Sequence, residues 1–141
     1  TAAGSVCDVP VTSTDFYPTL LELLGLALPN DEPRDGVSFA GLLGGGPAPA
    51  REALFWHYPH YHGTWWRPGA ALRAGDWKLI EFYEDERVEL YNLRDDLGER
   101  RDLSAAMPEK TQELRAMLHA WQRRVGAQRP VPNPAYVDAD A

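Results

Sequence analysis

The alternation of polar and apolar residues in the middle of the chain predicts a pair of strands. Residues 77–83 alternate, but both sides of the alternation carry apolar groups, which is typical of a strand covered on most of both faces. Residues 84–86 are all acidic and form the expected turn, and residues 88–93 form the return strand. We therefore expect an antiparallel hairpin at the centre of the fold.

Two further strands and a long helix complete the pattern around this hairpin. Residues 51–58 and 69–73 are the other predicted strands, with Leu54 and Trp56 on one face of the first and Phe55 and His57 on the other. In residues 108–125 apolar side chains recur at steps of three and four, which predicts a helix that packs on the sheet. The tail after this helix contains several prolines and is expected to be an extended strap or a disordered end.

The amino-terminal part of the chain predicts an earlier, separate unit. Residues 16–24 form a helix that is apolar nearly all round, so it needs cover on several sides that this chain does not obviously supply. A connection rich in proline and glycine follows, across residues 26–49. We place a boundary near residue 50, between units 1–50 and 51–141. The predicted fold class is α+β, with a small four-stranded antiparallel sheet packed by the long carboxy-terminal helix.

Composition excludes some classes of partner. A chain of 141 residues with a formal net charge of −7 lacks the basic footprint that nucleic acid requires. No apolar run is long enough to span a bilayer, so neither nucleic acid nor a membrane is an expected partner. The single cysteine, Cys7, excludes an internal disulfide but does not place the protein in a compartment.

A loop crowded with aromatic and histidine side chains is the clearest candidate for a site. It joins the first two strands of the sheet, across residues 59–68. A pocket wall that binds an anionic or hydroxylated substrate, a surface loop without a role, and a metal site are the alternatives. The metal alternative is disfavoured, because no cysteine or aspartate sits nearby as a further ligand. For the pocket wall, the expected substrate-binding residues are His57, His60, Tyr61 and Trp65.

Other reactive residue types have simpler explanations. A nucleophilic thiol needs a base and an activating environment, which the flanking Val6 and Asp8 do not offer, so we expect Cys7 to be a small structural thiol. Lys78 lies in mid-strand, where a salt bridge is more common than a role in a pocket. We expect no catalytic residue and no metal ligand in this chain.

Four ordered motifs resemble those of type I sulfatases. The first is similar to the family's D-x-x-P-T-L-L-x-x-x-G helix, and the second to the D-G-x-S-L that follows it. The third looks like the G-x-[WY]-K-L-I strand, and the fourth like the E-L-Y-D-L-x-x-D-P-x-E-x-x-N-L block. Two positions depart from the last motif, where the chain has Leu97 for proline and Asp102 for asparagine. The motifs occupy residues 13–25, 35–39, 75–80 and 89–103.

The resemblance implies that this chain is the carboxy-terminal portion of an enzyme of the alkaline phosphatase superfamily that hydrolyses sulfate esters. Residues 1–50 would then hold the last core helix of the parent's α/β catalytic domain, and residues 51–141 the small subdomain that closes one wall of the substrate cleft. The parent would use calcium and a formylglycine made within a C-x-P-x-R motif. Cys7 does not stand in such a motif, so this part alone is expected to be inactive and to bind neither.

The implied partners are the missing amino-terminal catalytic domain of the same protein and a sulfated small molecule or glycan. Two alternatives stay open at this point. The parent is a phosphodiesterase or phosphonate hydrolase of the same superfamily, or the chain is a stand-alone interaction or sugar-binding module.

Overall fold

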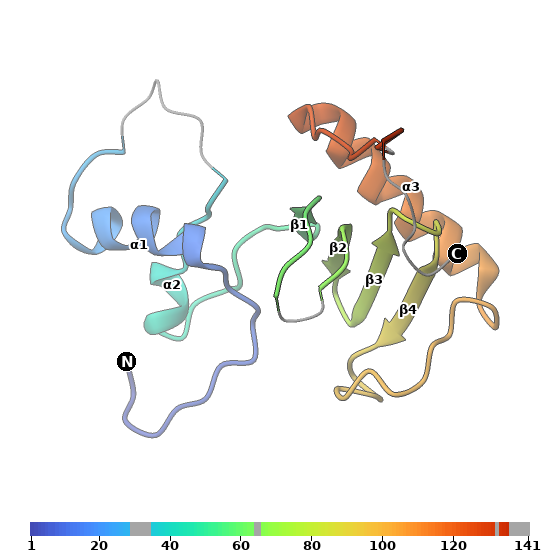
Figure 1. Cartoon of the computed structure of the whole chain (residues 1–141). Helices are drawn as coiled ribbons and strands as arrows, with labels where there is room; N and C mark the ends of the chain where they lie inside the picture. Colours follow the sequence, from blue (N-terminus) through green and yellow to red (C-terminus); the bar gives the residue numbers. More distant parts are fainter. Residues whose placement is uncertain (29–34, 64–65, 132, 136–141) are drawn as a thin grey trace. The chain divides into compact units, whose positions relative to one another are not determined.

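Four strands form one antiparallel sheet in the order β1-β2-β3-β4, so each strand pairs with its neighbour in sequence (Figure 1). Their bounds are β1 Leu54–Tyr58, β2 Gly69–Ala74, β3 Trp77–Phe82 and β4 Val88–Asn92. The computed structural model describes residues 1–28, 35–63, 66–131 and 133–135. Within it the chain divides into two compact units, Thr1–Arg51 and Glu52–Ala141, and the sheet belongs to the second.

Helix α3, Pro108–Val125, covers one face of the sheet (Figure 1). It begins at a proline, which suits the first turn of a helix, and it ends at Gly126, whose φ of 66° is the left-handed conformation that glycine adopts readily. Its leucines pack against alternate residues of three strands, as the helical and strand periodicities require. The fully buried leucines of this layer are Leu72, Leu79, Leu90, Leu114 and Leu118.

The opposite face of the sheet carries a smaller apolar cluster and no helix of its own unit among the described residues. Ala71, Ile80, Phe82 and Tyr91 are buried there and pack with Trp66 and Leu93. The register places Trp56 opposite Ala71, and Ala71 opposite Ile80, so these side chains share this face. We call it the open face.

The amino-terminal unit is organised by the buried carboxylate of Asp15. This residue ends the short 3₁₀ helix η1, Ser13–Asp15, and precedes helix α1, Phe16–Leu23. Its oxygens accept hydrogen bonds from the backbone N–H of Thr12 at 2.8 Å and of Val37 at 2.9 Å, and from the guanidinium of Arg51. Burial raises the pKa of Asp15, but these hydrogen bonds and the charge of Arg51 outweigh it and hold the pKa below its ordinary value.

The segment after residue 34 packs directly on the start of α1. A Cβ atom at Gly36 would lie 2.0 Å from the carbonyl oxygen of Thr14, so only glycine fits at that approach. The hydroxyl of Thr19 donates to the carbonyl of Asp15 at 2.6 Å and accepts from the N–H of Phe39 at 3.0 Å. Helix α2, Ala40–Leu43, follows immediately. Two of the motifs in the sequence therefore hold each other in place.

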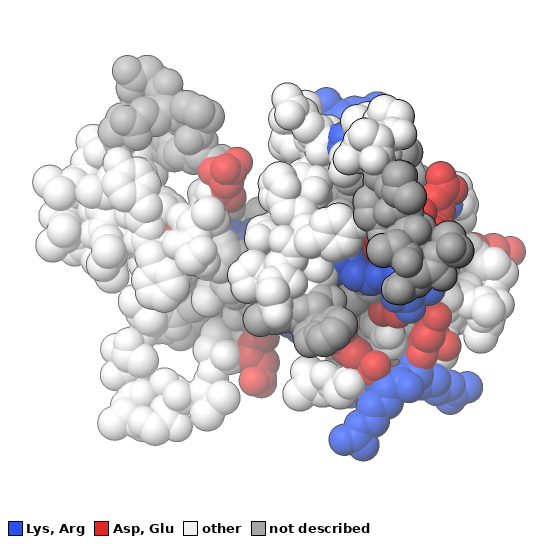
Figure 2. Space-filling view, viewed as in Figure 1, with Lys and Arg blue, Asp and Glu red and all other residues white. Residues whose placement is uncertain are grey.

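Helix α1 exposes much of its apolar surface. Leu20 and Leu23 are each 55% exposed, and Leu24 is 70% exposed. The cover that the sequence requires for this helix is therefore not supplied by the described residues. Charged groups are also sparse over the amino-terminal unit on the face that Figure 2 shows, whereas they gather on the sheet unit.

The predicted fold class is confirmed: the second unit is an α+β arrangement of a four-stranded antiparallel sheet and a carboxy-terminal helix. The strand bounds differ from expectation mainly at β1, which starts at Leu54 instead of residue 51. In the sequence, the boundary between the two units falls between residues 51 and 52. The assignment of the first unit to a larger catalytic domain stays a prediction. In the described part of the chain, none of the helices combines the length and the apolar character needed to cross a bilayer.

Replacing Leu118 by alanine should destabilise the sheet unit strongly. The side chain is fully buried between α3 and the sheet, so its loss leaves a cavity and should lower the free energy of unfolding by about 2–5 kcal/mol. Leu97→Ala is the matched control, because Leu97 is 79% exposed and should change stability by at most about 0.5 kcal/mol. Urea unfolding of the chain followed by circular dichroism measures both. Equal losses in the two variants would contradict the packing of α3 on the sheet.

Candidate functional site

The histidine-rich loop, residues 59–68, leaves the sheet at the end of β1 and returns at the start of β2. Its return is held by the N–H of Tyr83, which donates to the carbonyl of Pro68 at 2.9 Å. The first residue of β2 must be glycine, because a Cβ atom at Gly69 would lie 2.7 Å from the carbonyl oxygen of Glu81. Close approach of β2 to β3 thus fixes where the loop ends.

The loop is also tied to the acidic turn between β3 and β4. Arg67 forms an ion pair with Glu84 at 3.0 Å, and the hydroxyl of Tyr61 donates to the same carboxylate. Inside the loop the N–H of His62 donates to the carbonyl of Trp66 at 3.2 Å. These contacts give the described part of the loop a defined path, although all of them lie near the surface.

The four residues predicted to bind substrate have different surroundings. His60 lies edge-on to the ring of Tyr58, with 5.6 Å between the ring centroids. Tyr61 is 69% exposed, and its hydroxyl donates a hydrogen bond to the carboxylate of Glu84. Trp65 lies outside the described residues. His57 stands on β1 and points to the face that α3 covers, as Phe55 does, whereas His60 packs against Tyr58, which lines the pocket on the open face.

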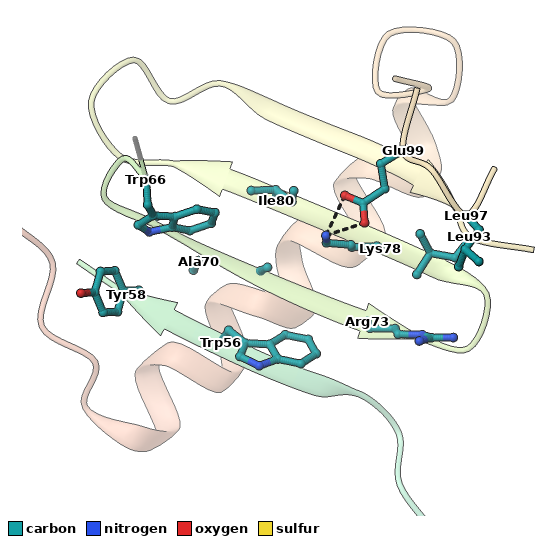
Figure 3. A pocket seen from close by; sticks show the side chains of 12 residues that line it. Trp56, Tyr58, Trp66, Ala70, Arg73, Lys78, Ile80, Leu93, Leu97 and Glu99 are labelled. Carbon is teal, nitrogen blue, oxygen red and sulfur yellow. Dashed lines mark hydrogen bonds and ion pairs between the residues drawn. The ribbon is translucent and has the colours of Figure 1, made fainter. Parts of the chain in front are cut away.

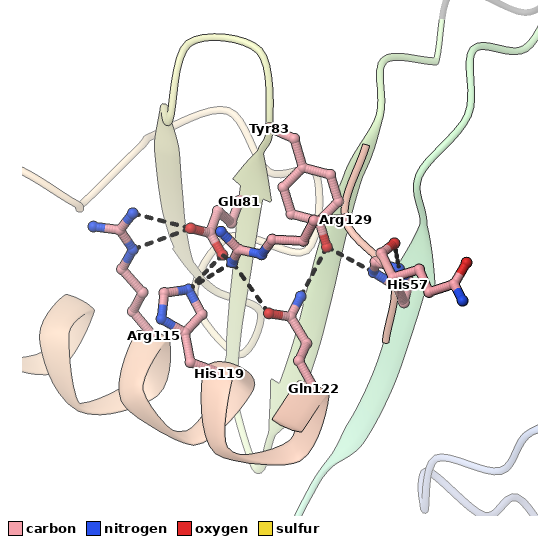
Figure 4. Close-up of polar contacts among 8 residues, drawn as sticks. His57, Glu81, Tyr83, Arg115, His119, Gln122 and Arg129 are labelled. Carbon is pink, nitrogen blue, oxygen red and sulfur yellow. Dashed lines mark hydrogen bonds and ion pairs between the residues drawn. The ribbon is translucent and has the colours of Figure 1, made fainter. Parts of the chain in front are cut away.

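His57 belongs to a polar network between α3 and the sheet (Figure 4). Its Nδ1 lies 2.6 Å from the hydroxyl of Tyr83, and its Nε2 lies 3.0 Å from the carbonyl oxygen of Gln128. Gln122 donates from its amide to the same hydroxyl at 2.8 Å. Both ring nitrogens of His57 are thus engaged within the unit, which suits a residue that supports the loop from its root.

Glu81 is the charged centre of this network. It is 1% exposed, yet its carboxylate accepts hydrogen bonds from Arg115 at 2.9 Å, His119 at 2.7 Å and Arg129 at 3.1 Å. Burial raises the pKa of Glu81, but these hydrogen bonds and the positive charge nearby outweigh it and hold the pKa below its ordinary value. A buried carboxylate with this many donors is satisfied, so it serves structure and not proton transfer.

A pocket of about 410 Å³ lies on the open face of the sheet (Figure 3). Ala70, Ala71 and Ile80 line its floor, and aromatic rings of β1 and of the loop stand around it. Trp56 and Tyr58 remain 45% and 41% exposed there. The apolar lining offers a surface for another apolar group and little that would activate a reacting atom.

One ion pair crosses the rim of this pocket and joins two of the sequence motifs. The ammonium of Lys78 on β3 lies 2.7 Å from both carboxylate oxygens of Glu99. Glu99 has a φ of 52°, and the carboxylate of Asp96 accepts from the N–H groups of Arg100 and Arg101 at 2.8 Å each. The tight turn that presents Glu99 to Lys78 is therefore stabilised by Asp96.

Sequence reasoning missed most of this pocket. It treated Lys78 as a strand lysine in a salt bridge, which it is, but not as a group that lines a pocket. None of Trp56, Tyr58 and Trp66 is among the residues predicted to bind substrate. The signal was present in the alternation, since Trp56 and Tyr58 share one face of β1 and no second helix follows in the sequence to cover that face.

The described residues offer surfaces for binding and no metal centre. Across residues 1–28, 35–63, 66–131 and 133–135, no three histidine, cysteine or acidic side chains come together as a metal site would require. Cys7 is exposed. The groups that the described residues assemble are aromatic walls, hydrogen-bond donors and ion pairs such as Lys78 with Glu99.

Comparison with known proteins identifies relatives over most of the chain. The family described as "N-sulphoglucosamine sulphohydrolase, C-terminal" matches residues 1–127. A protein of Formosa agariphila named "Sulfatase" is 37% identical over 125 residues, which is 79% of this chain and 23% of that protein. The chain thus spans about a quarter of the length of its relatives.

Solved structures show the same fold. The structure of a 2-O GAG sulfatase superposes with a TM-score of 0.69 and 27% identity, covering 80% of this chain and 25% of the other. A phosphonate monoester hydrolase from Silicibacter pomeroyi superposes with a TM-score of 0.64 and 26% identity, covering 87% of this chain and 27% of the other. The fold alone therefore does not separate these two activities.

Replacing Glu81 by glutamine should destabilise the sheet unit in a pH-dependent way. At pH 7 the change removes the buried negative charge opposite two arginines and should cost about 3–5 kcal/mol. The pKa of Glu81 is lower in the folded state than its ordinary value of 4.5, so the ionised carboxylate contributes stability above pH 4.5. That contribution is lost as the pH falls through the folded pKa.

The measurement is urea unfolding of the chain and its variants between pH 7 and pH 3. Glu113→Gln is the matched control, because Glu113 pairs with Lys110 at the surface of α3 and its loss should cost at most about 1 kcal/mol. A difference between Glu81→Gln and the unchanged chain that stays constant down to pH 3 would show that the ionised carboxylate does not carry the effect.

Proposed function

The chain belongs to the family of sulfatase carboxy-terminal domains, and from that premise we propose that it completes the substrate cleft of an enzyme that hydrolyses sulfate esters. In this proposal the chain is the carboxy-terminal portion of a larger protein. Its own part is to dock on the catalytic domain and to present the histidine-rich loop to substrate. It is inactive by itself.

The observation that supports docking on the catalytic domain is the apolar surface that the described residues leave exposed to solvent. On the open face Trp56 and Tyr58 stand beside a pocket of about 410 Å³, and Leu20 and Leu23 of α1 and Leu24 directly after it are more than half exposed. Burial of such surface gains about 25 cal/mol per Å², so a covering partner is strongly favoured. The chain spans about a quarter of the length of its relatives. We therefore propose the amino-terminal catalytic domain of the same protein as the occupant.

The chemical step belongs to that domain in this proposal. Family resemblance implies that a formylglycine nucleophile and a calcium ion serve the reaction, and Cys7 in its present sequence context does not match the formylglycine motif. The described residues also bring no three potential metal ligands together. This chain would therefore supply binding surface, and the nucleophile and metal ligands would come from the catalytic domain.

The substrate proposed is a sulfated small molecule or glycan. His60 and Tyr61 lie on the exposed part of the loop, where the hydroxylated ring of a sugar can reach them from solvent. Aromatic and histidine side chains suit the apolar faces and hydroxyl groups of a sugar. Trp65 is proposed as a further wall, and His57 supports the loop from β1 with both ring nitrogens already engaged.

A phosphonate or phosphate diester is the second candidate substrate class. The observation that favours it is the superposition on the phosphonate monoester hydrolase, whose TM-score of 0.64 is close to the 0.69 of the GAG sulfatase. Sulfate and phosphonate esters share their tetrahedral shape, so the family's fold accommodates both. The sequence relative named as a sulfatase and the family match both favour sulfate.

The deciding experiment assays the full-length parent protein against 4-nitrophenyl sulfate and a phenyl phosphonate monoester under identical conditions. The proposal expects hydrolysis of the sulfate to exceed that of the phosphonate and the isolated chain to hydrolyse neither. Preference for the phosphonate would establish the second candidate. A parent without either activity, together with glycan binding by the isolated chain, would instead establish a stand-alone sugar-binding module.

Replacing His60 and Tyr61 together by alanine in the full-length parent should weaken substrate binding. Lost contacts of this kind raise KM with little change in kcat, and an increase of about 5- to 50-fold in KM on the sulfated glycan corresponds to two polar contacts. Arg94→Ala is the control, since Arg94 is a surface residue outside the loop with a side chain that is 77% exposed. Unchanged kinetics on the glycan in the double variant would remove the loop from the substrate site.

A further inference from the structure

The segment after α3, residues 126–131, folds back along the helix-covered face of the sheet, and we call it the strap. Its turn begins at Gly126, and the N–H of Ala127 then donates to the carbonyl of Gln122 at 2.9 Å. Gln128 and Arg129 follow directly and reach residues of β1 and β3. The strap therefore connects the end of the helix to two strands that are far from it in sequence.

Arg129 is the main anchor of the strap. Its Nη2 donates to Glu81 and to the amide oxygen of Gln122, each at 3.1 Å. Its guanidinium also stacks over the ring of Tyr83, 5.0 Å from the ring centroid. A planar guanidinium suits this combination of hydrogen bonds and ring contact better than a lysine ammonium does.

The hydrogen bonds of the strap have a single consistent direction (Figure 4). The carbonyl of Gln128 can only accept, so Nε2 of His57 donates to it, and Nδ1 of a neutral His57 then accepts from the hydroxyl of Tyr83. That hydroxyl accepts in turn from the amide of Gln122, whose oxygen accepts from Arg129. The chain of donors starts at Arg129 and ends at the adjacent residue, Gln128.

Tyr83 holds both stems of the histidine-rich loop. Its N–H binds the carbonyl of Pro68 at 2.9 Å, just before β2, and its hydroxyl binds His57 at 2.6 Å, two residues before the loop begins. Burial raises the pKa of Tyr83 to about 12, so its hydroxyl remains available as a donor. A change in the strap can thus reach the loop through Tyr83, in addition to the direct bond between His57 and the carbonyl of Gln128.

We propose that the strap sets the conformation of the histidine-rich loop, with Arg129 and Tyr83 as positioning residues that fix the Nε2–H tautomer of His57. Loop and strap also face each other across a cavity of about 760 Å³, with Tyr61 on the loop side and Pro130 and Val131 on the strap side. When the strap is fixed by its hydrogen bonds, the stems of the loop have one conformation. When those hydrogen bonds are lost, the stems can adopt several conformations. The structural part of this inference is independent of the proposed function, and its kinetic part rests on it.

The first test is nuclear magnetic resonance on the chain itself. In Arg129→Ala the ¹⁵N shifts of the His57 ring should move from the Nε2–H tautomer toward a mixture. Amide hydrogen exchange in residues 57–62 should rise by about tenfold, because these stems lose a fixed neighbour while the leucine core keeps its packing. Arg129→Lys should restore the shifts only in part, since an ammonium does not reproduce the fork of a guanidinium.

Two further variants separate positioning from general stability. Tyr83→Phe keeps the ring and the backbone bond to Pro68 but removes the hydroxyl, so it should loosen the β1 stem as Arg129→Ala does and leave the β2 stem unchanged. Arg124→Ala is the control, because Arg124 is an exposed arginine in the last turn of the same helix. Exchange that rises equally across all four strands in Arg129→Ala, or not at all beyond Arg124→Ala, would overturn the inference.

The second test is kinetic and uses the full-length parent. Arg129→Ala should raise KM for a sulfated glycan by about threefold or more while kcat and the hydrolysis of 4-nitrophenyl sulfate stay within about twofold, because the reacting group is untouched. A parent without sulfatase activity would count against the proposed function and leave the tautomer and exchange results to decide this inference. Normal kinetics in a variant whose loop is shown to be loosened would overturn the link between loop conformation and substrate binding.

Discussion

A sheet with apolar residues on both faces needs to be covered on both, and the described residues of its unit place a helix on one face alone. Helix α3 buries the leucine layer, and on the other face aromatic side chains of β1 remain almost half exposed. The hydrophobic effect makes such a surface unfavourable in water. The same reasoning applies to α1, where Leu20 and Leu23 are exposed. The open face and the exposed helix are therefore consequences of one constraint: the chain has more apolar surface than its described elements can bury.

The family motifs act in this chain through structure. Asp15 and Thr19 hold the segment around Gly36 against the start of α1. In the sheet unit Asp102 accepts from the N–H groups of Leu90 and Ser104, which fixes the connection from β4 toward α3. In each case a short polar side chain satisfies backbone donors that would otherwise be left without partners. A resemblance carried by such residues identifies an architecture reliably and leaves the chemistry to be argued from elsewhere.

The sequence predicted the four-stranded antiparallel sheet, the helix that covers it and the unburied first helix, because strand and helix periodicities reflect burial directly. It did not predict the pocket on the open face or the network around Glu81. Both depend on residues distant in sequence, such as Glu81 with Arg129 and Lys78 with Glu99, whose meeting requires the folded register. Side-chain alternation shows which face a residue occupies but not what stands opposite it. Local patterns therefore recover elements well and sites poorly.

His57 illustrates that the face of a strand on which a residue lies determines its neighbours more than closeness in sequence does. It lies three residues from His60, and a reading by proximity places both in one cluster. On β1 it shares its face with Phe55, which packs in the helix-covered core, so its side chain is directed toward α3 and not toward the exposed part of the loop. Both of its nitrogens are engaged there, one by a side chain and one by the strap. Because both of its nitrogens are engaged, His57 serves in our proposal to support the loop, and the exposed His60 and Tyr61 are the residues that we propose for direct contact with substrate.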